Sequence, residues 1–238
     1  MHVPDGFLDA PTSIATAVVA TAGVGAALRG ARRDLDDRTT PIAGLVAVFI
    51  FAGQMINFPV GAGTSGHLLG GALAAVLAGP WLATLALTVV LMIQAFLFAD
   101  GGITALGSNI VLMGLVGVWV GWFVFRGAVA LLPRKRSSLP LAAAIGAYVS
   151  VVAASGAFVA LYAVGGQAPV PLGSVFVAMV SWHALIGIGE ALITGLVVGS
   201  VVAVRADLVA GARGIRESGD LVVRTVVAQA PSTRESAA

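Results

Sequence analysis

Three histidines and the first nitrogens of the chain are the groups in this sequence best suited to bind a metal ion. The histidines are His2, His67 and His183. A free Met1 amine, the peptide nitrogen of His2 and the His2 imidazole are consecutive nitrogens, and they can wrap one ion in five- and six-membered chelate rings. Thiolate ligands are excluded, because the 238 residues include no cysteine.

A fourth nitrogen would complete a square around such an ion, and we expect the His67 imidazole to supply it. The Pro4-Asp5-Gly6 turn can fold the terminus back into the protein, and the glycines of residues 61–66 allow the loop before His67 to approach closely. Square-planar nitrogen coordination suits Ni(II) or Cu(II), whereas zinc prefers a tetrahedron. The alternative is that Met1 and His2 form a frayed terminus.

The composition indicates a membrane protein built of helices. Hydrophobic residues make up 58% of the chain and charged residues 10%, and the mean hydropathy is +1.01. Soluble domains carry about 25% charged residues, so a soluble globular domain is excluded. The net charge is only +2, and the basic residues lie in loops and in the tail, so we expect no nucleic-acid partner.

Seven apolar segments predict an all-α, polytopic transmembrane bundle. They are residues 12–28, 41–56, 67–79, 82–99, 106–125, 140–164 and 174–204. A span needs about 20 residues, so residues 67–79 are short for a full crossing. We expect residues 1–204 to form one transmembrane metal-binding domain and residues 205–238 a cytoplasmic tail that is partly disordered.

The basic residues predict the orientation of the chain. Lys and Arg cluster after the first, fifth and last segments, and the positive-inside rule makes these clusters and the C-terminus cytoplasmic. Met1, His2 and His67 then lie on the outer side. The first 28 residues contain no Lys or Arg, so they do not resemble a secretory signal, and we expect the N-terminus to be retained.

Few ionisable or amide side chains fall in or beside the expected spans, and charged residues in spans tend to face the interior of a bundle. They are Gln54, Asn57, Gln94, Asp100, Asn109, His183 and Glu190. His183 and Glu190 are seven residues apart, hence on one helix face. They could support the metal site, relay protons as in a proton-coupled secondary carrier, or join helices. A remoter alternative is an intramembrane serine protease of the rhomboid kind, with Ser65 in Gly63-Thr64-Ser65-Gly66 and His183 as its dyad.

Four separated segments resemble the CbiM/NikM family. They are Met1 to Leu8, Gly63 to Gly71, Phe98 to Asn109, and Trp182 to Thr194. The resemblance implies the substrate-specific membrane component of an energy-coupling factor (ECF) transporter for Ni2+ or Co2+, with no other cofactor. It also implies that Met1, His2 and His67 bind the ion. We expect Asp100, Asn109, His183 and Glu190 to support these ligands.

The same resemblance implies that this chain is not an enzyme and works with other subunits. The expected partners are an ECF transmembrane coupling protein, a pair of ECF ATPase subunits and, in some systems, a small two-span accessory subunit. The sequence contains no Walker motif, in agreement with ATP hydrolysis on a separate subunit. The expected location is the cytoplasmic membrane, with several crossings.

Overall fold

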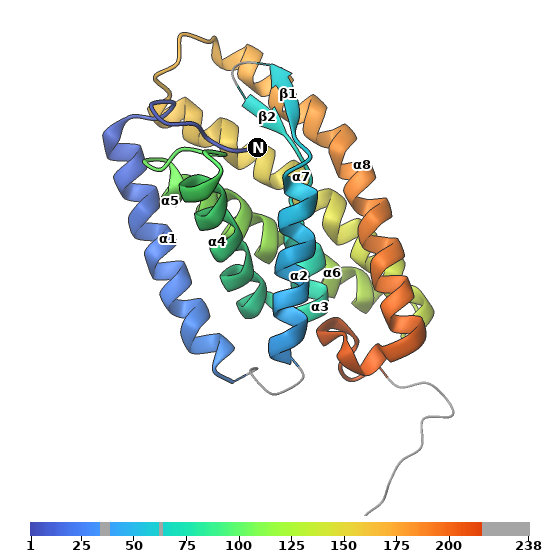
Figure 1. Cartoon of the computed structure of the whole chain (residues 1–238). Coiled ribbons are helices and arrows are strands. Elements are labelled where there is room, and N and C mark those ends of the chain that lie inside the picture. Colours follow the sequence, from blue (N-terminus) through green and yellow to red (C-terminus); the bar gives the residue numbers. More distant parts are fainter. Residues whose placement is uncertain (34–38, 62–63, 216–238) are drawn as a thin grey trace, which may run out of the picture.

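The apolar segments form long helices that run up and down one bundle in the computed structural model, which describes residues 1–33, 39–61 and 64–215 (Figure 1). The helices are α1 (Ala10–Ala31), α2 (Thr39–Gln54), α3 (Gly71–Ala78), α4 (Pro80–Leu97), α5 (Leu106–Asn109), the π-helical η1 (Ile110–Gly117), α6 (Val118–Leu131), α7 (Leu139–Gly165) and α8 (Leu172–Arg205). The α5, η1 and α6 helices follow one another without a break and form a single long helical element. The expected transmembrane helical bundle is confirmed.

Five helical stretches among the described residues are long and apolar enough to cross a membrane. They are Ala10–Ala31, Pro80–Leu97, Leu106–Leu131, Arg136–Gly165 and Leu172–Leu208. The α2 helix is shorter, and α3 has only eight residues. The short third segment, residues 67–79, does contain a helix, but this helix begins at Gly71, and residues 67–70 before it are not helical.

Local sequence signals explain where these helices begin. The Asp9 carboxylate accepts a hydrogen bond of 2.8 Å from the Thr12 amide and caps α1. The α1, α4 and α7 helices each carry a proline in their first turn, where its missing N–H is not needed. Gly79 joins α3 to α4 with φ of +92°, a backbone conformation that favours glycine and permits the sharp reversal.

The short α3 helix lies at the centre of the bundle, and all eight of its residues are buried. Small residues let its backbone approach α6 and η1. A Cβ at Gly121 would lie 2.6 Å from the Ala72 Cβ, and one at Gly71 would lie 2.9 Å from the Gly117 carbonyl carbon. This close approach is the packing expected of helices in a membrane.

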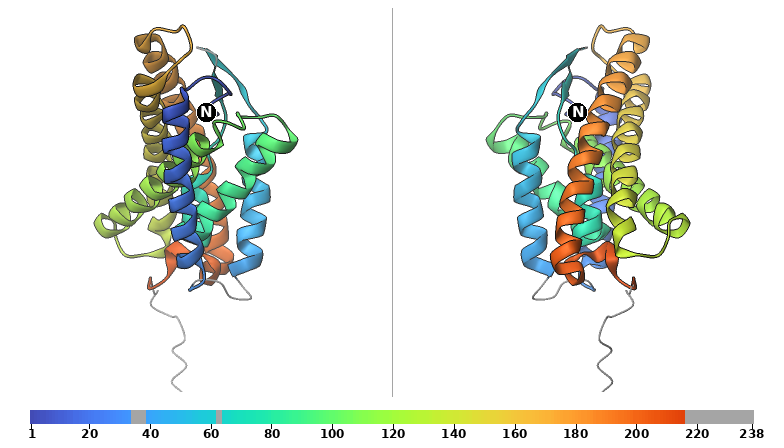
Figure 2. Two further views of the ribbon diagram at one scale, coloured as in Figure 1. Left: turned by 90° about the vertical axis from the view of Figure 1, so that its left-hand side faces the viewer. Right: turned by 90° about the vertical axis from the view of Figure 1, so that its right-hand side faces the viewer.

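A two-stranded hairpin caps one end of the bundle and was not foreseen from the sequence. Its strands are β1 (Phe58–Gly61) and β2 (Thr64–Gly66), which pair antiparallel. Figures 1 and 2 show the hairpin and the N-terminus at one end, whereas the basic ends of α1, α6 and α8 lie at the other.

The chain after α8 folds back onto the bundle before the described residues end. Two 3-10 turns, Ala206–Leu208 and Ala210–Ala212, follow the helix. Val209 and Ala212 join the buried cluster that includes Phe125 of α6. The expected tail from residue 205 therefore begins as packed structure, and the disorder expected toward its end falls on residues 216–238, outside the described residues.

Candidate metal centre

The N-terminal segment is threaded into the bundle beneath the hairpin. Met1 is fully buried, and His2 and Val3 are 4% and 1% exposed. Figure 1 shows the N-terminus surrounded by helices and the hairpin. The segment is therefore a fixed part of the core, which confirms the expected insertion and excludes a frayed terminus.

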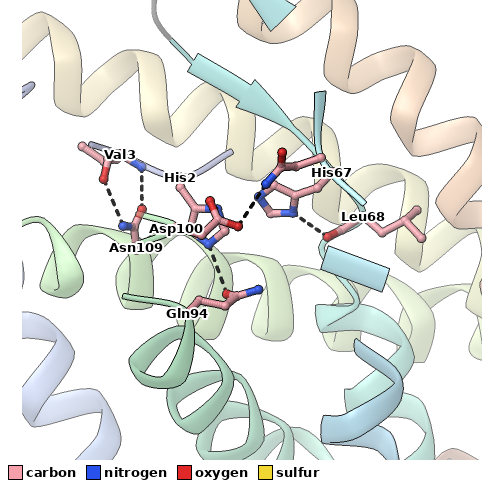
Figure 3. Close-up of polar contacts among 8 residues, drawn as sticks. His2, Val3, His67, Leu68, Gln94, Asp100 and Asn109 are labelled. Carbon is pink, nitrogen blue, oxygen red and sulfur yellow. Dashed lines mark hydrogen bonds and ion pairs between the residues drawn. The ribbon is translucent and has the colours of Figure 1, made fainter. Parts of the chain in front are cut away.

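Main-chain hydrogen bonds hold this segment in place on the side of α5. The Asn109 side chain accepts a hydrogen bond from the Val3 amide at 2.7 Å and donates one to the Val3 carbonyl at 3.2 Å (Figure 3). The Gly102 amide also donates to the Val3 carbonyl, at 2.9 Å. Asn109 thus clasps both polar groups of one residue, in the way that a neighbouring strand would.

The next residues are pinned to α7. The Phe7 ring packs against Phe158 and Tyr162, with centroid separations of 5.6 and 5.0 Å. The Phe7 carbonyl accepts a hydrogen bond from the Gln167 amide at 3.0 Å, and the Asp9 amide donates to the Gly165 carbonyl at 2.7 Å. Both sides of the Pro4-Asp5-Gly6 turn are therefore fixed, which leaves the first two residues little freedom.

Each nitrogen of the His2 imidazole lies near a side-chain oxygen. Its Nε2 lies 3.2 Å from the Gln94 amide oxygen (Figure 3). Its buried Nδ1 lies 3.2 Å from the Asp100 carboxylate and has no other polar partner within the described residues. Nδ1 is the nitrogen that forms a six-membered chelate ring with the His2 amide.

The His67 imidazole lies against that of His2. The two rings are stacked, with centroids 4.5 Å apart and planes inclined by 29°. His67 Nδ1 lies 2.7 Å from the Leu68 carbonyl, so it carries the proton, whereas buried Nε2 has no hydrogen-bond partner among the described residues. Two imidazoles 65 positions apart in the chain therefore lie together in one buried place.

The main-chain amine of Met1 is buried as well and is a further nitrogen that could bind a metal ion. Burial lowers the pKa of this amine from 8.0 to about 4, against a smaller opposing effect of the Asp100 charge. The amine is therefore neutral at neutral pH, and its lone pair is available. In the described part of the chain, no group of three or more His, Cys, Asp or Glu side chains is placed to hold a metal ion.

The loop that carries His67 is fixed by two side chains from other helices. Glu190 of α8 accepts hydrogen bonds from the Leu69 and Gly70 amides at 2.6 and 2.8 Å. Gln54 of α2 donates to the Leu69 carbonyl at 2.7 Å. These bonds satisfy main-chain groups that no helix satisfies, and they show Glu190 acting as an anchor of this loop.

Glu190→Gln should destabilise the protein without removing a nitrogen from the site. The amide group of glutamine can accept from one of the two main-chain N–H groups but directs its own N–H toward the other. We expect a loss of about 1–3 kcal/mol in stability, the usual effect of an unsatisfied buried donor, measured as a fall in unfolding temperature in detergent.

Thr194→Val provides the matched control for that change. Thr194 lies one turn further along the same buried face of α8, and its hydroxyl has no hydrogen-bond partner among the described residues. We expect this variant to unfold within a few degrees of the parent. Equal destabilisation by both variants would contradict the anchoring role of Glu190.

An open cavity of about 400 Å³ connects this cluster to the outside of the bundle at the hairpin end. His2 and Asp100 lie at its floor, and Asn57 and hairpin residues form its walls. Asn57 donates a hydrogen bond of 3.1 Å to Asp100. The contact with His2 is the largest influence that lowers the pKa of Asp100, so its carboxylate is charged at neutral pH and makes the cavity attractive to cations.

The structure places each residue expected to support the ligands. Asp100 contacts His2, Asn109 clasps Val3, and Glu190 holds the segment after His67. His183 is fully buried on the same face of α8 as Glu190. Ser65 lies in β2, opposite Pro59 of β1.

Two polar contributors were seen in the sequence only as residues inside spans. Gln94 fixes the His2 ring, and Gln54 fixes the His67 loop. The sequence showed only that Gln94 and Gln54 lie within apolar segments. It did not indicate that they contact the His2 ring and the Leu69 carbonyl.

A polytopic helical bundle with buried nitrogens beside an open cavity that Asp100 lines is the arrangement expected of a membrane component that binds metal ions. The family described as "cobalt uptake substrate-specific transmembrane region", CbiM, matches residues 2–208. The chain belongs to the CbiM family, and it is a multi-pass membrane component of a transporter and not an enzyme.

Individual relatives agree with this assignment. A protein of Haloquadratum walsbyi, named for metal transport, is 39% identical over 209 residues, which are 88% of this chain and 93% of that protein. The fused nickel transport protein NikMN of Rhodobacter capsulatus is 38% identical over 83% of this chain and 60% of its own length. A crystal structure described as a truncated transition metal transporter has a TM-score of 0.80 at 32% identity and covers 85% of this chain and 99% of that chain.

Proposed function

We propose that this chain captures a Ni2+ or Co2+ ion in a square of four nitrogens and delivers it to an ATP-driven ECF importer. The four are the Met1 amine, the His2 amide, His2 Nδ1 and His67 Nε2. One observation carries the proposal: His67 Nε2 is buried without a hydrogen-bond partner within the described residues, and its ring is stacked on that of His2, whose buried Nδ1 lies 3.2 Å from the Asp100 carboxylate. Two imidazoles bound at neighbouring corners of a square lie side by side in this way.

The surroundings support this use of the terminus. Asn109 and Gly102 bind the main chain of Val3, so the His2 peptide is held from its C-terminal side. Gln94 and Asp100 each contact one nitrogen of the His2 ring, and the Leu68 carbonyl sets the tautomer of His67. Partners that orient a metal ligand in this manner commonly change metal affinity 10–100-fold when they are lost.

The proposed orientation places the cavity outside and the basic helix ends in the cytoplasm. The basic ends of α1, α6 and α8 gather at the end of the bundle opposite to the hairpin, as the positive-inside rule requires. An ion would then enter past Asp100. We place the protein in the cytoplasmic membrane, with an ECF coupling protein, two ECF ATPase subunits and, in some systems, a two-span accessory subunit as partners.

Metal binding and uptake by the purified protein test this function. Protein with its native start at Met1 should bind one Ni2+ or Co2+ ion per chain. Vesicles that also contain the coupling and ATPase subunits should accumulate the ion only when ATP is supplied on the cytoplasmic side. Uptake that follows a proton gradient without those subunits would instead identify a secondary carrier.

The affinity for the ion should fall in acid because a main-chain amide must lose its proton to bind. The Met1 amine, with its pKa of about 4, is already neutral near neutral pH and releases no proton there. The His2 amide releases one proton for each ion bound, so added protons compete with the ion. We expect affinity to fall at least about tenfold per pH unit between pH 8 and 6, measured by titration against a chelator of known affinity. A pH-independent affinity would exclude the amide as a ligand.

A further inference from the structure

The face of α8 that lies against the His67 loop contacts it at two points. Near the hairpin, Met179 Sδ accepts a hydrogen bond from the Thr64 hydroxyl at 3.3 Å. Deeper in the bundle, Glu190 binds the amides of Leu69 and Gly70. His183 lies between Met179 and Glu190 on this buried face, just as His67 lies between Thr64 and Leu69 in the loop. The two imidazoles are therefore at matching heights across one interface.

His183 has the same hydrogen-bond state as His67. Its Nδ1 lies 2.8 Å from the Met179 carbonyl and carries the proton. Its Nε2 is buried and has no hydrogen-bond partner within the described ranges. A buried acceptor without a partner is uncommon and calls for a bound species.

Polar atoms continue along α8 beyond His183. Glu190 lies seven residues further, about 10 Å deeper at the rise of an α-helix. A small cavity of about 20 Å³ is lined by Glu190, Thr194 and Leu69. The Thr194 hydroxyl and the Gln54 amide oxygen are both buried without a hydrogen-bond partner in the described part of the chain. Along α8, from the hairpin end of the bundle toward the end with the basic residues, the His183 nitrogen is therefore followed by the side-chain oxygens of Glu190 and Thr194.

We propose that His183 Nε2 is a second, inner ligand position for the transported divalent ion, to which the ion passes from His67 Nε2. In this step one coordinate bond forms to His183 as the bond to His67 breaks, and the charge of the ion is unchanged. As the ion leaves the outer square, the His2 amide takes back one proton from water. This position presupposes the outer site proposed above and gives the direction of transfer, along α8 toward Glu190.

A cysteine at position 183 would report the ion directly. The chain has no cysteine, so His183→Cys introduces its sole thiol, and a bound metal ion deprotonates such a thiol. Loading the full-length variant with Co2+ should produce the charge-transfer absorption of a cobalt–thiolate bond. The matched control is Val198→Cys, which is also buried on this face but lies about 22 Å further along the helix and should give no such band.

Uptake measurements separate a ligand from a structural residue. His183→Leu removes the nitrogen at similar volume, and ATP-driven Ni2+ uptake with the partner subunits should fall about tenfold or more, while equilibrium affinity changes less than about threefold. His183→Cys should keep most of the uptake, because it can still coordinate the ion. Equal loss in both variants would assign His183 a purely structural role.

The outcomes distinguish this position from the outer site. Parent protein that binds no metal would overturn the outer site and the inner one with it. Parent protein that binds through His67, combined with no thiolate band and undiminished uptake by His183→Leu, would overturn the inner position alone and leave His183 Nε2 to a buried water molecule.

Discussion

Adding residues ahead of Met1 is expected to abolish metal binding. An extension converts the Met1 amine into an amide, which removes one of the four proposed nitrogens. It also forces new atoms into a place where Met1 is already fully buried. Loss of a direct ligand should exceed the 10–100-fold effect usual for supporting residues, so we expect affinity to fall by more than about a hundredfold. Titration of Ni2+ against a chelator measures it.

A removable extension separates the chemistry of the terminus from damage to the fold. The extended protein is purified, divided, and one half is treated with a protease that leaves Met1 as the first residue. Binding should return in the treated half. An extension after Ala238 should leave the affinity unchanged, because the last described residues lie at the end of the bundle opposite to the N-terminus. Full affinity with a blocked Met1 would exclude the amine as a ligand.

His67→Ala should have the second large effect, because it removes the corner of the square that comes from outside the N-terminal segment. The remaining three nitrogens belong to two consecutive residues, and they would bind the ion with an open position facing the cavity left by the ring. We expect affinity to fall by about a hundredfold or more. The absorption spectrum of bound Ni2+ should shift as one nitrogen donor is replaced.

Ser65→Ala is the control that shares this loop. Ser65 is only partly buried and lies in β2, two residues before His67, so its loss tests the general sensitivity of the hairpin. Affinity within about threefold of the parent is expected, since it supplies no ligand. Similar losses in both variants would mean that the hairpin, and not the imidazole, determines binding.

The positions of most helices could be predicted, because membrane-spanning helices appear in a sequence as long apolar segments. The apolar runs predicted the helices with errors of a few residues, and the absence of Lys and Arg from the first 28 residues was compatible with the burial of Met1. The proximity of His2 and His67 was also predictable. Met1 and His2 supply three nitrogens and need a fourth to complete a square, and the basic residues at the other helix ends place His2 and His67 on the same side. The stacked rings confirm that proximity.

The contacts that orient the nitrogens could not be predicted, because they join residues far apart in the chain. Gln94 meets His2 across 92 positions, and Glu190 meets Leu69 across 121. The pattern of residues within one segment does not predict which main-chain group of a distant segment a polar side chain will contact. The hairpin escaped notice for a related reason: its strands have four and three residues, and a bulge interrupts their register.

The shortness of α3 reduces the distance that an ion must travel through a low-dielectric medium. Eight helical residues cover about 12 Å, whereas the hydrocarbon layer is about 30 Å thick. The remainder of that pass is the irregular loop before Gly71, whose main-chain groups Glu190 and Gln54 satisfy. Irregular backbone survives at such depth only inside protein. An ion bound at the proposed His67 position, at the head of this loop, would therefore have passed part of the dielectric barrier before any subunit moves.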